Sequence, residues 1–145
     1  MLYHKQDYRW NEASAHAPIH SSIYKQFSEA KFIAYAMPPY ALSYSLKHPI
    51  LEPKDYFGAK YIAHTKIFDP KDYESWEERA NTEIPRYFKD NPVPFVIIKG
   101  YGVYVYARDI YTLSKGIALI EHSCKILHFN ADLGDVFEAS SKYDI

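Results

Sequence analysis

The chain has 145 residues, of which 48% are hydrophobic and 24% charged, and its formal net charge is −1. This length and composition suit one globular domain, residues 1–145, and leave little room for a second. The near-neutral charge, with no basic block, argues against nucleic acid and against a membrane surface as partners.

The N-terminal part of the chain predicts an irregular segment followed by a helix. Residues 1–12 contain aromatic side chains without a clean period, so an irregular N-terminal segment is expected there. A helix should span residues 18–30, because Pro18 is well placed in a first turn. Three apolar residues then follow at the spacing of one helix face: Ile19, Ile23 and Phe27.

A strand and a shorter helix come next. Residues 31–37 predict a buried strand, which Pro38 ends because proline cannot continue a hydrogen-bonded ladder. Residues 40–47 predict a short helix that stops before Pro49, since the residue before a proline disfavours helical backbone angles. The two-residue period of the strand places three side chains on one face: Ile33, Tyr35 and Met37.

The middle of the chain is less regular. Residues 52–64 are ambiguous, with aromatic residues that could line a helix, and residues 66–68 could form a short strand. A charged helix is expected from Asp69 onward, because a capping aspartate followed by a first-turn proline is typical of a helix start. Pro85 should break this helix near Thr82 or kink it there. Its apolar side would carry Tyr73, Trp76 and Ala80.

Residues 94–127 are the most regular stretch. Two runs of β-branched and aromatic residues flank Gly100-Tyr101-Gly102, whose glycines favour a tight turn, so a strand, a turn and a second strand are predicted. Asp109 can cap a helix directly afterwards. Apolar residues recur in this helix at alternating spacings of three and four: Ile110, Leu113, Ile117, Ile120, Cys124 and Leu127.

The order of these elements implies a sheet covered by helices, and therefore an α/β fold. The single cysteine, Cys124, lies on the apolar stripe of the last helix and is expected to be a buried free thiol. No window approaches about 18 uninterrupted apolar residues and no targeting pattern is visible, so a cytoplasmic location is expected. Residues 130–145 form a possible tail.

Several of these segments, in this order, resemble the class II aldolase/adducin head family. Residues 18–24 (PIHSSIY) are similar to the family's helix carrying His-x-x-Ile-Tyr, and residues 36–41 (AMPPYA) to its His-Pro-Pro-Tyr-Ala segment. Residues 96–103 (VIIKGYGV), the helix start at Asp109 and Glu121 within that helix also resemble the family.

The resemblance extends from about Ala13 to Leu127. It implies a three-layer α/β/α sandwich with a shortened N-terminal part. Family members commonly form homotetramers with the active site between neighbouring subunits, so a homo-oligomer is expected. The 15 tyrosines and eight phenylalanines are consistent with subunit contacts.

The same resemblance indicates that the family's metal ligands are replaced. Active members bind a divalent metal, usually zinc, through a His-x-His pair and a histidine before Gly-Val, and the matching positions here are Tyr35, Met37 and Tyr101. A neutral phenol and a thioether are poor zinc ligands, so neither a metal nor another cofactor is expected. The family's phosphate-binding loop is not expected either. The position of its catalytic glutamate, four residues before His20, is occupied by His16.

His16 and His20 have a spacing that could place two metal ligands on a helix. Ala17, however, precedes Pro18 and is pushed away from helical angles, so the two histidines are not expected to share a face.

The three replaced ligand positions are expected to meet in the former metal cleft. The simplest interpretation is that Tyr35, Met37 and Tyr101 fill it as packed core. The alternative is an aromatic pocket for a small-molecule ligand, with His16 or His20 as polar groups.

The leading functional hypothesis is a catalytically degenerate, metal-free relative of the class II aldolases that serves as a binding or assembly module. Two alternatives stay open. One is a sugar-phosphate aldolase or epimerase with an altered metal site, in which His16 would be the candidate catalytic residue. The other is a small-molecule sensor that uses the aromatic pocket.

Overall fold

A three-stranded antiparallel sheet forms the middle of the molecule, in the order β1-β5-β4. β4 (Phe95–Ile98) and β5 (Gly102–Ala107) are the two strands predicted around the glycine turn. β1 (Phe32–Ala36) pairs with the other side of β5, and this register sets Tyr35 opposite Tyr104.

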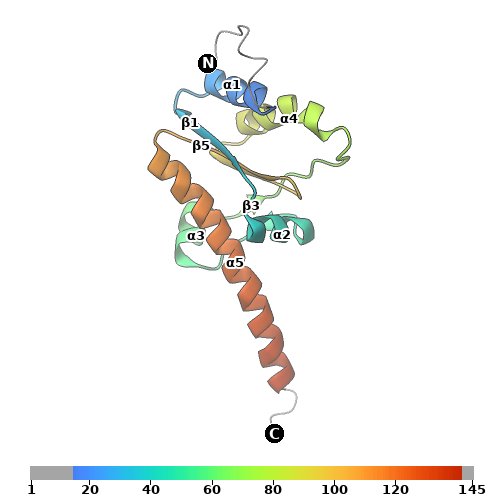
Figure 1. Ribbon diagram of the computed structural model, residues 1–145. Helices are drawn as coiled ribbons and strands as arrows, with labels where there is room; N and C mark the ends of the chain where they lie inside the picture. Colours follow the sequence, from blue (N-terminus) through green and yellow to red (C-terminus); the bar gives the residue numbers. More distant parts are fainter. Residues whose placement is uncertain (1–14, 142–145) are drawn as a thin grey trace.

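Helices cover both faces of this sheet in the computed structural model, which describes the backbone of residues 15–141 and the side chains of residues 15–131. The irregular segment predicted at residues 1–12 therefore lies outside the described residues. On one face lie α1 (Ala17–Gln26) and α4 (Trp76–Asp90). On the other lie α2 (Pro39–Lys47), α3 (Tyr56–Tyr61) and α5 (Ile110–Ser141) (Figure 1). This is the predicted three-layer α/β/α arrangement.

β4 and β5 are buried on both faces, because the two-residue period of a strand sends alternate side chains into opposite layers. Toward α1 and α4 point Val96, Ile98, Tyr104 and Tyr106. Toward α2, α3 and α5 point Phe95, Ile97, Val103, Val105 and Ala107. The two layers of core thus meet at this hairpin.

β1 lies at the edge of the sheet, so the prediction of a buried strand is wrong. Four of its five residues are only partly buried and Phe32 is 41% exposed, because within the described part of the chain only β5 pairs with it. Met37 follows the last residue of β1 and is 64% exposed. The expectation that Met37 packs as core is therefore also wrong.

α4 begins at Trp76 and not at Asp69, so the predicted helix start is wrong. The Asp69 carboxylate instead accepts a hydrogen bond at 2.9 Å from the backbone N–H of Lys71, which closes a local turn. Lys71 has a φ of 63°, which a right-handed helix does not include. Tyr73 is exposed ahead of the helix, whereas Trp76 and Ala80 are buried as predicted.

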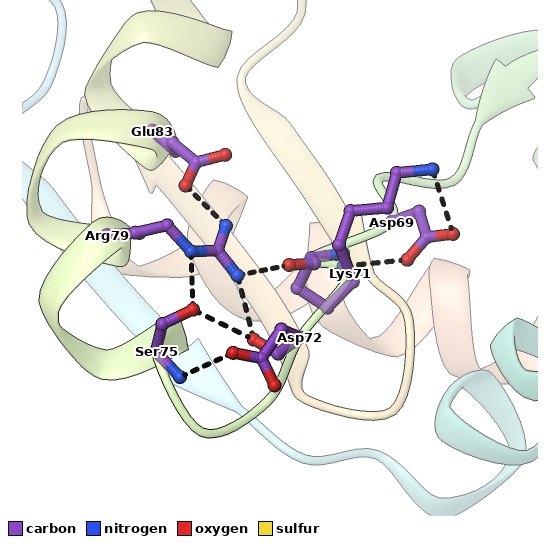
Figure 2. Close-up of polar contacts among 7 residues, drawn as sticks. Asp69, Lys71, Asp72, Ser75, Arg79 and Glu83 are labelled. Carbon is purple, nitrogen blue, oxygen red and sulfur yellow. Dashed lines mark hydrogen bonds and ion pairs between the residues drawn. The ribbon is translucent and has the colours of Figure 1, made fainter.

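Arg79 fixes the loop before α4 (Figure 2). Its guanidinium donates to the carbonyl oxygens of Pro70 at 2.5 Å and Asp72 at 2.8 Å. Its Nε–H donates to the hydroxyl of Ser75 at 2.9 Å, and Glu83, one turn further along α4, pairs with it at 2.6 Å. One side chain therefore connects the loop to the first two turns of the helix.

Two helices run further than predicted. α4 continues through the buried Pro85, so of the break or kink predicted near Thr82 the break does not occur. α5 extends to Ser141, so residues 130–141 are helical rather than a tail.

The apolar stripe of α5 is buried or partly buried except at its start, because Ile110, expected on this stripe, is 63% exposed. The rest of the stripe packs against the sheet as predicted: Leu113, Ile117, Ile120, Cys124 and Leu127. Cys124 is a buried free thiol.

The ambiguous middle of the chain contains α3 and a small two-stranded sheet of β2 (Ile50–Leu51) and β3 (Thr65–Lys66). The short strand expected at residues 66–68 is thus only partly formed, with Phe68 making an isolated parallel bridge to Ile98. The aromatic residues that could line a helix do lie in α3, but their side chains are exposed: Tyr56, Phe57 and Tyr61. α1 ends at Gln26, short of the expected residue 30.

Within residues 15–141, no helix combines the length and the apolar character needed to cross a lipid bilayer.

Candidate functional site

Four of the five predicted pocket residues meet on the face of the sheet covered by α1. The His16 ring stacks on the ring of Tyr35, with centroids 4.7 Å apart, and the Tyr35 ring lies 5.0 Å from that of Tyr101. His20 lies one helical turn after His16, with ring centroids 6.5 Å apart. Met37, the fifth, is largely exposed beyond the end of β1.

The expectation that the two histidines would not share a helix face is wrong. The backbone N–H of His20 donates to the carbonyl oxygen of His16 at 3.1 Å, which is the bond of a first helical turn. Pro18 occupies that turn without cost, because the N–H that proline lacks is unpaired there in any helix. Both imidazoles therefore come to the tyrosine rings.

Tyr104 lies at the centre of this group and is the residue that sequence reasoning missed. It is fully buried, its ring lies 5.0 Å from Tyr35 and 5.9 Å from His20, and its hydroxyl is hydrogen-bonded to Nδ1 of His16. The two-residue period of β5 could place its side chain on one face of the strand with that of Tyr106, but only the pairing of β1 with β5 sets it opposite Tyr35. We call His16, His20, Tyr35, Tyr101 and Tyr104 the tyrosine cluster.

The glycine turn allows the rings to approach. Gly102 has a φ of 151°, and a Cβ added there would lie 2.5 Å from Cε1 of Tyr35 and 2.6 Å from the carbonyl oxygen of Ala36. Only a residue without a side chain fits against β1 at this point. The Tyr35 hydroxyl passes over the turn and donates to the carbonyl oxygen of Tyr101 at 2.5 Å.

Burial dominates the electrostatics of the tyrosine cluster. Removal from water, with the nearby Tyr101 as a smaller cause, raises the pKa of Tyr35 to about 12. Burial also raises the pKa of Tyr104 and that of Tyr101, although a hydrogen bond with Tyr104 partly lowers the latter. Burial and then the neighbouring His16 lower the pKa of His20. At neutral pH the phenols keep their protons and His20 is uncharged.

Two buried nitrogen atoms beside these rings have no hydrogen-bond partner among the described residues: Nε2 of His20 and Nε1 of Trp76. The Trp76 ring meets that of Tyr101 edge-on, at 5.7 Å between centroids. A buried polar atom without a partner costs free energy comparable to that of a lost hydrogen bond. Each of these nitrogens therefore leaves one hydrogen bond unmade among the described residues.

These side chains do not fit a zinc ion. Zinc prefers imidazole, thiolate or carboxylate ligands, and no group of three histidine, cysteine or acidic residues lies close enough to hold a metal in the part of the chain that the structure describes. Tyr35 and Tyr101, at two positions that the resemblance assigns to ligands, are protonated phenols at neutral pH, and burial raises their pKa values further above the ordinary value. His16 already directs Nδ1 to the Tyr104 hydroxyl.

Comparison with known proteins agrees with this fold. The family model described as Class II Aldolase and Adducin N-terminal domain matches residues 3–128. Among solved structures, L-fuculose-1-phosphate aldolase from Thermus thermophilus is similar, with a TM-score of 0.73 and 18% sequence identity. The match covers 85% of this chain and 64% of the aldolase chain, so this chain spans less than two thirds of that protein's length. No curated protein matches the sequence.

Proposed function

Because the chain belongs to the Class II Aldolase and Adducin N-terminal domain family, we propose that it is a catalytically degenerate member that serves as a binding or assembly module. The observation that carries this proposal is the tyrosine cluster. Protonated phenols of Tyr35 and Tyr101 pack ring against ring where the family resemblance expects metal ligands. A packed, uncharged cluster of this kind offers no charge to assist metal-dependent cleavage of a carbon–carbon bond, which favours a role without catalysis.

The aldolase or epimerase alternative finds less support in this geometry. Cleavage of an aldol creates an enediolate, whose negative charge requires a nearby metal or cation. The candidate proton carrier, His16, is engaged by the hydroxyl of Tyr104. Its neighbour His20 has a lowered pKa and is uncharged at neutral pH, so it supplies no positive charge.

A small-molecule sensor is the second candidate, and one observation favours it. Nε2 of His20 and the indole N–H of Trp76 lie buried among stacked rings, without a partner among the described residues. A flat ligand that carries a hydrogen-bonding group could stack on the tyrosines and satisfy one of these atoms.

Assembly into a homo-oligomer, a tetramer by family resemblance, belongs to the leading proposal of a binding or assembly module. Light scattering measures the oligomeric state.

Zinc content is the measurement that tests the leading proposal. The protein is purified without a histidine tag, dialysed against buffer that contains zinc, and analysed for bound metal. We expect far less than one zinc per chain and no cleavage of sugar phosphates. Stoichiometric zinc, or aldolase activity that depends on it, would overturn the proposal in favour of the aldolase alternative.

A gain-of-function variant complements this measurement. Replacing Tyr35, Met37 and Tyr101 together by histidine should create zinc binding if the three positions converge on one site. A control in which Tyr35 and Tyr101 are replaced by phenylalanine keeps the rings and should bind no zinc.

The sensor alternative is tested in a Trp10→Phe variant, where a ligand at the tyrosine cluster would change the fluorescence of Trp76.

A further inference from the structure

A separate cavity of about 290 Å³ lies on the opposite face of the sheet from the tyrosine cluster, between α3, α5 and the β4–β5 hairpin. Its deepest lining residues are buried and apolar: Ile62, Phe95, Val105 and Ile120. We call this cavity the α3–α5 groove. Binding of an apolar group against such a lining is favourable, in proportion to the apolar area that it removes from water.

The rim of the α3–α5 groove is formed by its exposed lining residues. Tyr111 is 73% exposed, and Tyr61 and Lys115 are also exposed. The ammonium group of Lys115 lies 4.9 Å from the centroid of the Tyr61 ring, which holds a cation beside the opening.

Of the residues that the structure describes, Lys115 is the only charged one that lines the groove. Among the described residues it forms no ion pair. The rim therefore presents the positive charge of Lys115 above an apolar floor, and the ammonium group of Lys60, 5.3 Å from the same Tyr61 ring, adds a second positive charge beside it.

We propose that the α3–α5 groove binds a small amphipathic anion, namely a carboxylate with a short apolar tail. The tail covers the floor around Ile120 and Phe95, and the carboxylate lies beside Lys115. The volume is at the lower end of the range of roughly 300–1,000 Å³ for small-molecule sites, which favours a short tail over a long one. This site is independent of the function proposed above, because the two lie on opposite faces of the sheet.

Gly116 provides a way to close the groove without disturbing the fold. It lines the cavity from α5, and a Cβ added there would meet only Cγ1 of Val105, at an ordinary 3.5 Å. Alanine should therefore fit and also favour the helix. A leucine side chain, which is larger by three carbon atoms, should occupy the space of the ligand.

The experiment is a calorimetric titration of the full chain with sodium octanoate. We expect saturable binding of one octanoate per chain, and at least a tenfold loss of affinity in Gly116→Leu but not in Gly116→Ala. Lys115→Gln should weaken octanoate binding about two- to fivefold, the range for an exposed charge pair, and leave the affinity for octanol unchanged. Lys125→Gln is the matched control, because Lys125 lies on the same helix over the ring of Tyr40 and outside the groove.

Several results would overturn the proposal. These are absence of saturable binding at millimolar octanoate, equal affinity for octanoate and octylammonium, or binding that Gly116→Leu leaves unchanged. Self-association that Gly116→Leu abolishes, without any octanoate binding, would assign the groove to a second copy of the chain instead. If Gly116→Leu does not fold, as judged by circular dichroism, the head-group comparison in the wild type and in Lys115→Gln decides alone.

Discussion

Replacing Arg79 by methionine should destabilise the protein by removing the connection between the loop at residues 69–75 and α4. Methionine replaces the aliphatic stem of arginine with an unbranched apolar chain of similar helix propensity, so the change acts mainly on the guanidinium. Three hydrogen bonds are lost, to the carbonyl oxygens of Pro70 and Asp72 and to the hydroxyl of Ser75. The ion pair with Glu83 is lost as well.

The magnitude follows from the exposure of these groups. A hydrogen bond contributes about 0.5–1.5 kcal/mol net, and the acceptors freed here lie close to solvent, so values near the lower end apply. The Arg79 and Glu83 side chains are 32% and 28% exposed, which limits their i,i+4 pair to about 0.3–0.5 kcal/mol. The expected total is about 2 kcal/mol in the free energy of unfolding, or about 6–8 °C in Tm for a chain of this size.

Urea unfolding followed by circular dichroism measures this change, and Arg86→Met is the matched control because Arg86 is exposed on the same helix. We expect a lower midpoint with an unchanged m-value for Arg79→Met and less than about 0.5 kcal/mol for the control. Equal effects of the two substitutions would show that the loop does not depend on Arg79, and would refute the reasoning.

Three further predictions concern other parts of the fold. Glu121→Ala should lower the free energy of unfolding, measured in thermal melts, by about 1–2 kcal/mol. The Glu121 carboxylate accepts hydrogen bonds from the backbone N–H groups of Tyr40 and Ala41 at 3.1 and 2.8 Å and so caps α2. The control Glu78→Ala, at an exposed position, should be nearly neutral. Gly102→Ala should destabilise by more than about 1 kcal/mol, because its Cβ would lie 2.6 Å from the Ala36 carbonyl oxygen, while Gly116→Ala should be neutral or stabilising. The free energy of unfolding should be constant below about pH 9 and fall as the pH rises toward 12. Burial raises the pKa of Tyr35 and of Cys124 to about 12. Above about pH 9 the folded state therefore holds protons that the unfolded chain has released, which favours unfolding. Tyr35→Phe should flatten this decline in unfolding curves recorded from pH 8 to 11.5, and a decline of the same slope in the variant would contradict the assignment to Tyr35.

Local signals predicted the hairpin and the last helix because both elements are specified by residues close in sequence. The turn glycines and the β-branched runs around Tyr101 lie within a few residues of one another. The start of α4 could not be predicted in this way, because Asp69 can cap a helix or close a turn equally well. Arg79, ten residues further along, holds the chain in the turn.

The candidate site was predicted only in part. The family resemblance brought His16, His20, Tyr35 and Tyr101 together, and the structure does so too. The central place of Tyr104 depends on the register between β1 and β5, which a single sequence does not specify. The edge position of β1, and with it the exposure of the residues that follow, depends on strand order in the same way.

The tyrosine cluster also has a consequence for the order in which the chain folds. β4 and β5 are joined by residues 99–101 alone, so their pairing closes a very short loop. The contact between Tyr35 and Tyr101 spans 66 positions, and that between His16 and Tyr104 spans 88. Contacts this distant in sequence form slowly, because the loop-closure entropy must be overcome first. We therefore expect the hairpin to form early and the rings to stack late, so that tyrosine and Trp76 fluorescence reports the final step of folding rather than the initial collapse.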